Sequence, residues 1–170
     1  NGADVTGLAI RLARSYTGNN HIIQSGYHGH HDWYSFLLRD SGTVKETKQY
    51  THPVQYNDIH AINELVNQYK GDVAGVILET AFDEPKEGYI DDLRELCNRE
   101  GIVLIFDEMW TGFRFSNGGF QEFIGVTPDI ALFSKGIANG YPISVITGKR
   151  NIMECFSKLW GFTTFGGEVL

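Results

Sequence analysis

The chain is poor in cysteine, proline and basic residues, and these shortages narrow the classes of protein to consider. Only 2 of its 170 residues are cysteine and 4 are proline, and it contains no repeat, low-complexity tract or linker. Cys97 and Cys155 show no paired spacing, which favours a reduced, cytosolic setting over the alternative of a disulfide. The 14 Lys and Arg residues are outnumbered by 21 Asp and Glu residues, giving a formal charge of −7. This excess argues against nucleic acid or an anionic membrane surface as a partner.

Long apolar runs are also missing. No run approaches the length needed to span a bilayer, and the first residues show no signal-peptide pattern. A chain of 170 residues can nevertheless bury a sizeable single core. We therefore expect a cytoplasmic globular protein with no membrane or nucleic-acid partner.

Two short apolar runs, each ending in charged residues, organise the chain. Ile102–Phe106 is followed by Asp107 and Glu108, and Ile130–Phe133 is followed shortly by Lys135. Each run is continuously apolar, which is typical of a strand covered on both faces. Ligands of open α/β sheets lie beyond the carboxyl ends of such strands. We therefore expect a carboxylate and an amine to reach the same crevice.

This pairing suits pyridoxal phosphate (PLP). A lysine can form a Schiff base with the aldehyde of the cofactor, and an acid can keep the pyridine nitrogen protonated so that the ring withdraws electrons. Asp107 and Lys135 are the candidates for these two roles. The simpler alternative is a buried Asp–Lys ion pair.

Two longer motifs contain these residues and resemble one family. FDEMWTGFR resembles the Asp-Glu-Val-x-Thr-Gly-Phe-Arg signature of class III (ω-type) aminotransferases, and LFSKGIANGYPISVITGKRNIME resembles their Schiff-base lysine segment. The resemblance covers essentially all 170 residues and is strongest to the glutamate semialdehyde aminomutase-like members. Met109 stands where valine is usual and would contact the cofactor, and Ala138-Asn139-Gly140 is less glycine-rich than the family turn.

The resemblance implies an α/β fold with three αβα layers and a mostly parallel sheet, as in the large domain of PLP-dependent transferases of fold type I. Residues 1–170 would form a single partial domain, the central part of that large domain, without the N-terminal segment and the C-terminal small domain. The residues agree, because the strand Val73–Leu78, a helix around Ile90–Cys97 and the strand Ile102–Phe106 predict right-handed parallel crossovers.

The chain begins with a small, glycine-containing turn that leads into an amphipathic helix. Such a turn presents free backbone N–H groups and a positive dipole end to an anion. The resemblance gives Gly2 and Ala3 the role of binding the cofactor phosphate. The residues alone favour an ordinary helix start capped by Asp4.

A histidine-rich stretch follows the first predicted strand, His21–Gln24. Its Tyr27-His28-Gly29 resembles the family's Tyr-His-Gly motif, in which the aromatic ring stacks on the pyridine face and excludes water. His28, His30, His31 and Asp32 also suggest a metal site, but their spacing does not let them converge easily. We therefore expect no metal.

Three further residues are site candidates. Glu79 ends the strand Val73–Leu78 where the family has Glu-Pro, with Thr80 in place of proline; it is a candidate catalytic residue or a helix-cap partner. Arg114 could clamp a substrate carboxylate or form a structural salt bridge. Thr164 resembles a family threonine that reaches the cofactor phosphate of the partner subunit, which implies a homodimer with composite sites.

The other elements are predicted from periodicity. Trp33–Gln55 reads as a surface loop with a strand near Thr51–Gln55, followed by a helix that carries Ile59 to Tyr69. After Lys135 we expect a strand over Ile143–Thr147 and a helix over Asn151–Phe156.

Together these features predict a PLP-dependent aminotransferase that moves an amino group between an amino compound and a keto acid or aldehyde. Lys135 would hold the cofactor as an aldimine and shuttle the proton, while Asp107 would keep the ring nitrogen protonated. The alternatives are an aminomutase, which moves the amino group within one molecule using the same residues, and a non-catalytic fragment.

Overall fold

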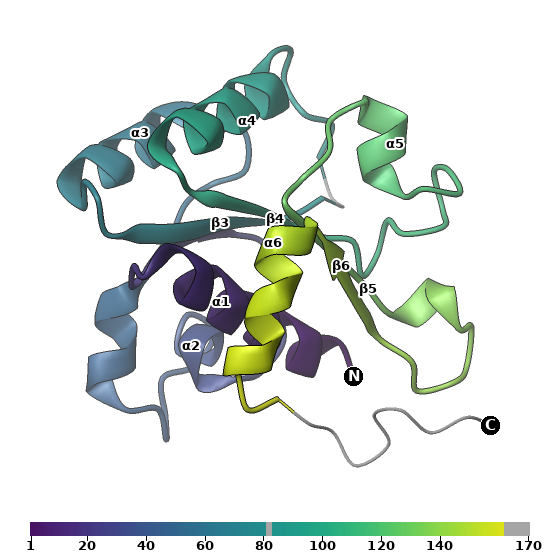
Figure 1. Cartoon of the computed structure of the whole chain (residues 1–170), viewed down its shortest axis with the longest axis horizontal. Coiled ribbons are helices and arrows are strands. Elements are labelled where there is room, and N and C mark those ends of the chain that lie inside the picture. The colour runs from purple at the N-terminus through teal and green to yellow at the C-terminus, as the bar shows by residue number, and fades with distance from the viewer. Residues whose placement is uncertain (81–82, 162–170) are drawn as a thin grey trace.

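The computed structural model describes residues 1–80 and 83–161, and a six-stranded sheet forms its centre (Figure 1). The strand order is β2-β1-β3-β4-β5-β6, with β1 to β5 parallel and β6 antiparallel to β5. This arrangement confirms the predicted mostly parallel α/β sheet. The strands are β1 (His21–Ser25), β2 (Thr51–Pro53), β3 (Val73–Glu79), β4 (Val103–Asp107), β5 (Ile130–Phe133) and β6 (Val145–Gly148).

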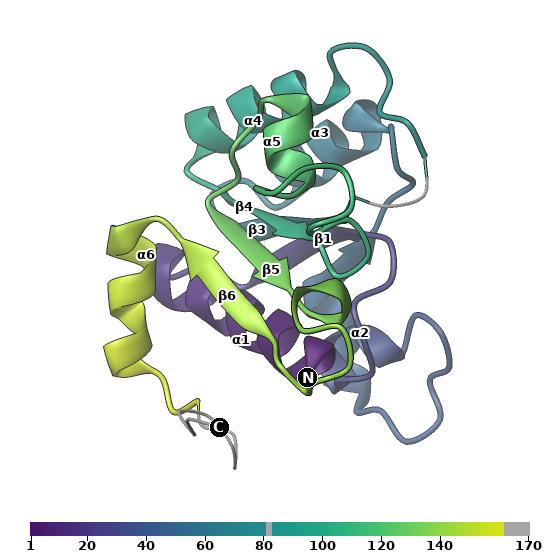
Figure 2. The same ribbon diagram turned by 90° about the vertical axis from the view of Figure 1, so that its right-hand side faces the viewer.

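Helices cover both faces of the sheet and make three layers (Figure 2). One face packs against α3, α4 and α5, and the other against α1 and α6. The α-helices are α1 (Gly2–Thr17), α2 (Asp32–Ser35), α3 (Ile59–Gln68), α4 (Tyr89–Glu100), α5 (Phe120–Ile124) and α6 (Arg150–Met153). The 3₁₀ helices are η1 (Lys45–Tyr50), η2 (Lys135–Ile137) and η3 (Glu154–Lys158).

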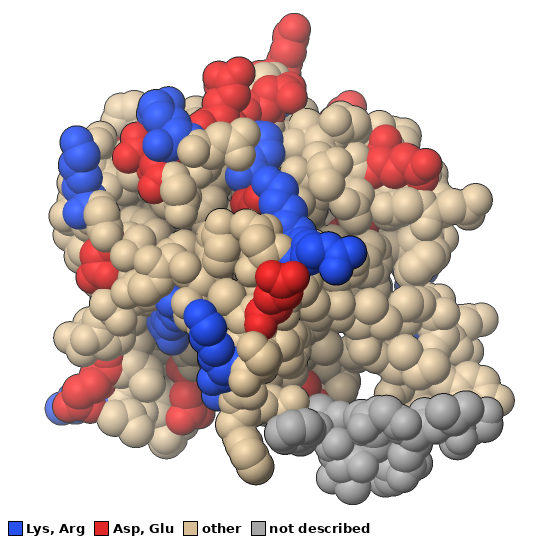
Figure 3. Space-filling model, in the orientation of Figure 1, with Lys and Arg blue, Asp and Glu red and all other residues tan. Residues whose placement is uncertain are grey.

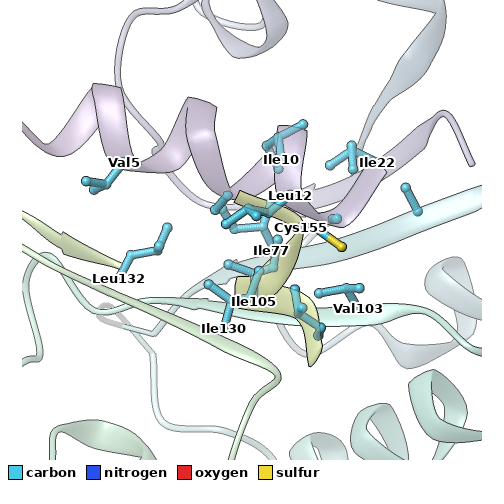
Figure 4. Close-up of a cluster of buried hydrophobic side chains, with 14 of the residues drawn as sticks. Val5, Ile10, Leu12, Ile22, Ile77, Val103, Ile105, Ile130, Leu132 and Cys155 are labelled. Atoms are coloured by element: carbon cyan, nitrogen blue, oxygen red, sulfur yellow. The ribbon is translucent and has the colours of Figure 1, made fainter. Parts of the chain in front are cut away.

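The central strands are continuously apolar because both of their faces are covered. All residues of β3, β4 and β5 are buried. Side chains from the two faces of these strands enter two separate cores, and Figure 4 shows the one beneath α1 and α6. Alternation along β4 explains the division, since Val103 and Ile105 belong to one core and Leu104 and Phe106 to the other.

Helix α1 begins earlier than the sequence predicts. The carboxamide of Asn1 accepts a hydrogen bond from the N–H of Asp4 (3.3 Å), so Asn1 is the N-cap and Asp4 lies in the first turn. The expectation that Asp4 itself caps the helix was wrong. The shift makes Gly2 and Ala3 the first two helical residues.

Most of the predicted helices and strands are present. The structure differs from the prediction where a segment is too short to show a clear period. The segment Trp33–Gln55 is not a plain loop, because it contains most of α2 and all of η1 before the strand β2. The helix expected over Asn151–Phe156 is split between α6 and η3. Helix α5 was not predicted.

Most charged side chains lie on the surface. On the face shown in Figure 3, acidic and basic side chains are interspersed, and acidic side chains gather along the upper edge above α4. Within residues 1–80 and 83–161, none of the helices combines the length and the apolarity needed to cross a bilayer.

Candidate functional site

Three neighbouring strands end at the same edge of the sheet and direct polar side chains there. In the parallel register Glu79 of β3 lies opposite Asp107 of β4, and Asp107 lies opposite Leu132 of β5, three residues before Lys135. A cavity of about 270 Å³ opens beyond these ends. Most of the residues that the sequence predicted line it, drawn from four separate stretches of the chain: Gly2, Ala3, Tyr27, His28, Asp107, Met109 and Lys135.

Asp107 is held by two donors inside the protein. Its side chain is about 1% exposed; Oδ1 accepts a hydrogen bond from the N–H of Met109 (3.1 Å), and Oδ2 lies 2.8 Å from Nδ1 of His28. The carboxylate therefore has a fixed direction at the base of the cavity.

His28 is the partner of Asp107, a role that the sequence did not reveal. Its Nε2 lies 3.2 Å from the carbonyl oxygen of Ser25, and its Nδ1 faces the Asp107 carboxylate. A carbonyl and a carboxylate can only accept hydrogen bonds, so both ring nitrogens of His28 face acceptors and the ring is placed to donate to Asp107. The buried His28–Asp107 pair therefore orients the Asp107 carboxylate.

Glu79 lies beside this cavity and lines a neighbouring one of about 380 Å³. Its Oε2 accepts a hydrogen bond from the backbone N–H of Tyr27 (2.7 Å). Burial raises the pKa of the Glu79 carboxyl, and the Tyr27 N–H opposes part of that rise. Gly26 permits this approach, because a Cβ there would lie 2.3 Å from the Cβ of Glu79. Glu79 thus fixes the backbone at Tyr27, one of the residues that line the cavity.

Lys135 starts η2 in a left-handed backbone conformation, with φ of +45°. Non-glycine residues with such values are uncommon and often occur at functional positions. The Nζ atom lies 4.8 Å from the centroid of the Trp110 ring. Ser134, just before the lysine, is anchored through its Oγ, which donates to the carbonyl of Ile143 (3.1 Å) and lies 2.9 Å from Ser144 Oγ.

The N-terminal end of α1 forms the opposite wall of the cavity. Gly2 and Ala3 line it, and the first N–H groups of a helix have no partner within the helix. The hydroxyl of Thr6 donates to the carbonyl of Ala3 (2.9 Å) and lies 2.8 Å from that of His28, which ties α1 to the Tyr27–Gly29 segment. Gly29 has φ of +100°, and a Cβ there would lie 2.7 Å from the Cβ of Ala3. The helix end and this segment therefore pack closely.

Glu108 is a further buried carboxylate whose role the sequence did not indicate. It accepts hydrogen bonds from the backbone N–H groups of Phe120 (2.5 Å) and Gln121 (3.1 Å) and from the hydroxyl of Thr111 (3.1 Å). Burial raises its pKa, and these donors oppose the rise. Glu108 joins the turn after β4 to the start of α5, so its role is to hold the loop in shape.

Thr80, which replaces the family proline, also braces this turn. Its hydroxyl lies 2.7 Å from the hydroxyl of Thr111 and 3.3 Å from the carbonyl oxygen of Asp107. Both threonines are buried. The end of β3 is therefore hydrogen-bonded to the Asp107–Thr111 turn.

Arg114 and His31 are not among the residues that line the cavity. Arg114 is exposed, and His31 pairs with Asp4 (3.3 Å) on the outer side of α1. Among the residues that the structure describes, no group of three or more His, Cys, Asp or Glu side chains is arranged to hold a metal ion. Cys97 and Cys155 are both buried free thiols. Thr164 lies outside the described residues, so its role stays a prediction.

The side chains around the cavity fit PLP. The cavity lies just below the roughly 300–1,000 Å³ of drug-sized sites and suits one small ring. Helix N–H groups at one wall suit a phosphate, the buried Asp107 suits a protonated ring nitrogen, and Lys135 supplies the amine that an aldehyde requires. None of the described side chains that line the cavity conflicts chemically with those needs.

A family model described as aminotransferase class-III matches residues 1–170. Among sequence relatives, the glutamate-1-semialdehyde 2,1-aminomutase of Chlorobium limicola is 44% identical over 172 residues, covering 90% of this chain and 39% of the relative. The 3-aminobutyryl-CoA aminotransferase of Cloacimonas acidaminovorans is 38% identical over 172 residues, covering 96% and 41%. The chain thus spans about two fifths of the length of these relatives.

Solved structures are similar as well. A PLP form of the FumI protein of Sphingopyxis sp. MTA144 superposes with a TM-score of 0.89 at 26% identity, covering 97% of this chain and 42% of the other. A glutamate-1-semialdehyde aminomutase from Pseudomonas aeruginosa PAO1 gives a TM-score of 0.78 at 26% identity, covering 100% and 40%.

Proposed function

The chain belongs to the class-III aminotransferase family, and on this premise we propose that it carries the cofactor-binding centre of a PLP-dependent aminotransferase. The substrates are an amino compound as donor and a keto acid or aldehyde as acceptor. Residues 1–170 correspond, in this proposal, to the central part of a PLP-binding large domain, in agreement with matches that cover about two fifths of the solved relatives.

One observation carries the proposal: Asp107 and Lys135 reach the same cavity from the ends of adjacent strands, with Asp107 already fixed by His28. An ordinary buried ion pair would place the two charged groups against each other. Here each has a different partner, since Asp107 pairs with His28 and the Lys135 ammonium lies over the Trp110 ring. Neither group is therefore held by the other in the cavity that both line.

Bound PLP would supply an aldehyde for amines and a protonated ring that withdraws electrons from the bond being broken. The residues of this chain would hold the cofactor and move the protons. Lys135 would hold PLP at its aldehyde carbon and, once the substrate amine has displaced it, would accept and return the proton at the substrate Cα. Asp107 would hold the ring nitrogen and keep its proton in place, with His28 behind it. Tyr27, whose backbone is held by Glu79, would pack against the ring, and the backbone N–H groups of Gly2 and Ala3 would hold the phosphate.

Further features of the whole protein belong to the same proposal. A homodimer with composite sites would let Thr164 of each subunit contact the phosphate of the other, and a cytoplasmic location suits the free thiols Cys97 and Cys155. No metal, membrane or nucleic acid is involved.

A second candidate is an aminomutase, an isomerase that returns the amino group to the same molecule. It is favoured by the relatives at 44% identity, which are named glutamate-1-semialdehyde 2,1-aminomutase. The residues described above serve both chemistries. Incubating the holoenzyme with an amino aldehyde and no added keto acid separates them by their products. An isomerase forms the isomeric amino compound, whereas an aminotransferase that uses the amino aldehyde as both donor and acceptor forms a diamine and a dicarbonyl compound.

The first test asks whether the cofactor attaches to the predicted lysine. The protein is mixed with PLP, reduced with borohydride and digested, and the peptides are weighed by mass spectrometry. We expect the pyridoxyl mass on Lys135, its loss in Lys135→Ala, and its retention in the matched control Lys86→Ala, which changes an exposed lysine. No attachment to the wild-type chain, or attachment that survives Lys135→Ala, would refute the proposal in favour of a non-catalytic protein.

A further inference from the structure

The turn after β4 packs against the end of β5, and this contact brings Trp110 to Lys135. The N–H of Glu108 donates to the carbonyl of Leu132 (2.9 Å). A Cβ at Gly112 would lie 2.5 Å from Cδ1 of Phe133, so this position has no room for a side chain. The backbone of the turn is therefore docked at both of its ends, with Trp110 between them.

The indole ring then lies against the lysine ammonium. The distance of 4.8 Å from Nζ to the ring centroid is within the roughly 6 Å range of cation–π attraction, for which tryptophan is the best aromatic side chain. The ring is 45% exposed, and therefore contributes less to the apolar core than a buried tryptophan would. A leucine or methionine would fill such a half-exposed position equally well, but would not attract a cation.

We propose that Trp110 is a positioning residue that holds the Lys135 ammonium at the cavity before the lysine reacts. The ring favours the charged amine over the neutral one and gives a flexible side chain one preferred direction. Together with the left-handed backbone of Lys135, it fixes both ends of the lysine. The inference rests on the proposed function only for the identity of the electrophile that Lys135 meets.

The test measures the reactivity of the amine in protein without cofactor. Trace acetic anhydride acetylates neutral amines, and mass spectrometry reports the rate at each lysine between pH 7 and 9. In Trp110→Leu we expect Lys135 to react roughly two- to fivefold faster than in wild type, the factor that about 0.5–1 kcal/mol of cation–π attraction corresponds to. Trp110→Phe should fall between the two, because phenylalanine binds cations less strongly.

Two controls separate charge from steric shielding. Near pH 11, where most lysine amines are neutral, the wild-type and Trp110→Leu rates should converge, since a neutral amine gains no cation–π attraction. A rate difference that is the same at every pH would mean that the ring only blocks the reagent, and would overturn the proposal. Phe113→Leu, which removes another half-exposed ring from the same loop, should leave the Lys135 rate unchanged.

Other outcomes are equally decisive. Equal Lys135 rates in wild type and Trp110→Leu at pH 7–9 would refute the role of Trp110. If Trp110→Leu does not fold by circular dichroism, Trp110→Phe carries the test, and an unchanged rate there refutes the proposal. These rates are measured without PLP, so failure of cofactor attachment would refute the proposed function and leave this inference intact. Unchanged acetylation rates together with normal attachment would refute this inference and leave the proposed function intact.

Discussion

Replacing His28 by leucine tests whether the buried pair with Asp107 is a charged one. The two side chains are 0% and 1% exposed, and their closest atoms are 2.8 Å apart. After His28→Leu the Asp107 carboxylate keeps the N–H of Met109 but has no ionic partner. Removing one member of a buried ion pair costs about 3–5 kcal/mol, which is a large share of the roughly 5–15 kcal/mol that stabilises a typical domain.

The measurement is urea unfolding of four proteins in a double-mutant cycle: wild type, His28→Leu, Asp107→Asn and the double variant. We expect the double variant to lose less stability than the sum of the single losses, by about 2 kcal/mol or more, because an amide at 107 no longer needs the imidazolium. His30→Leu is the matched control, since His30 is an exposed histidine in the same loop and should change stability by no more than about 0.5 kcal/mol. A coupling energy near zero would refute the charged pair.

Three further predictions concern titratable groups. Burial raises the pKa of Glu79, so folding favours its protonated form. The stability that this form contributes is lost as the pH rises through the raised pKa. Because an amide resembles the protonated carboxyl, Glu79→Gln should raise the urea midpoint at pH 7 but not at pH 4. Burial lowers the pKa values of His21 and His52, whose Nδ1 and Nε2 atoms lie 2.8 Å apart. Stability should be complete above about pH 6.5 and fall as the pH drops towards 5, and His52→Gln should flatten that fall; a flat wild-type profile would contradict this. Burial raises the pKa of Cys97 to about 12, so its thiol should resist an aromatic disulfide reagent at pH 8 until urea unfolds the chain, and fast labelling of the native protein would contradict the packing.

The central strands could be predicted because burial on both faces leaves a plain sequence signal. Ile130–Phe133 was predicted with the bounds that the structure shows, Val73–Leu78 ends one residue early, and Ile102–Phe106 begins and ends one residue early. Short helices such as α5 have too few turns to show a period, and Gly119, which precedes α5, has no side chain with which to cap it. The start of α1 was misjudged because Asn1 and Asp4 both suit a helix cap, and only the geometry shows which one accepts the hydrogen bond.

The residues of the candidate site that follow strand ends could be predicted. Those whose role depends on contacts between segments distant in sequence could not. Asp107 and Lys135 each follow an apolar run, so the topology of a parallel sheet places them together. The pairing of His28 with Asp107 joins residues 79 positions apart and leaves no local pattern. The contact between Trp110 and Lys135 likewise depends on how closely two turns pack, which Gly112 permits but does not by itself reveal.

Helix α1 makes the position of the cavity wall depend on the packing of aliphatic side chains far from the cavity. Ala9 and Leu12 are fully buried against the sheet, and Leu12 is ten residues from Gly2, a distance of about 15 Å along the helix axis. The helix is a stiff rod, so repacking at Leu12 that slides it by a fraction of an ångström would move its first N–H groups equally far. Anion affinity at this end would thus be adjustable by mutations that never touch the anion, and a search for variants with altered cofactor retention should begin in the core beneath α1.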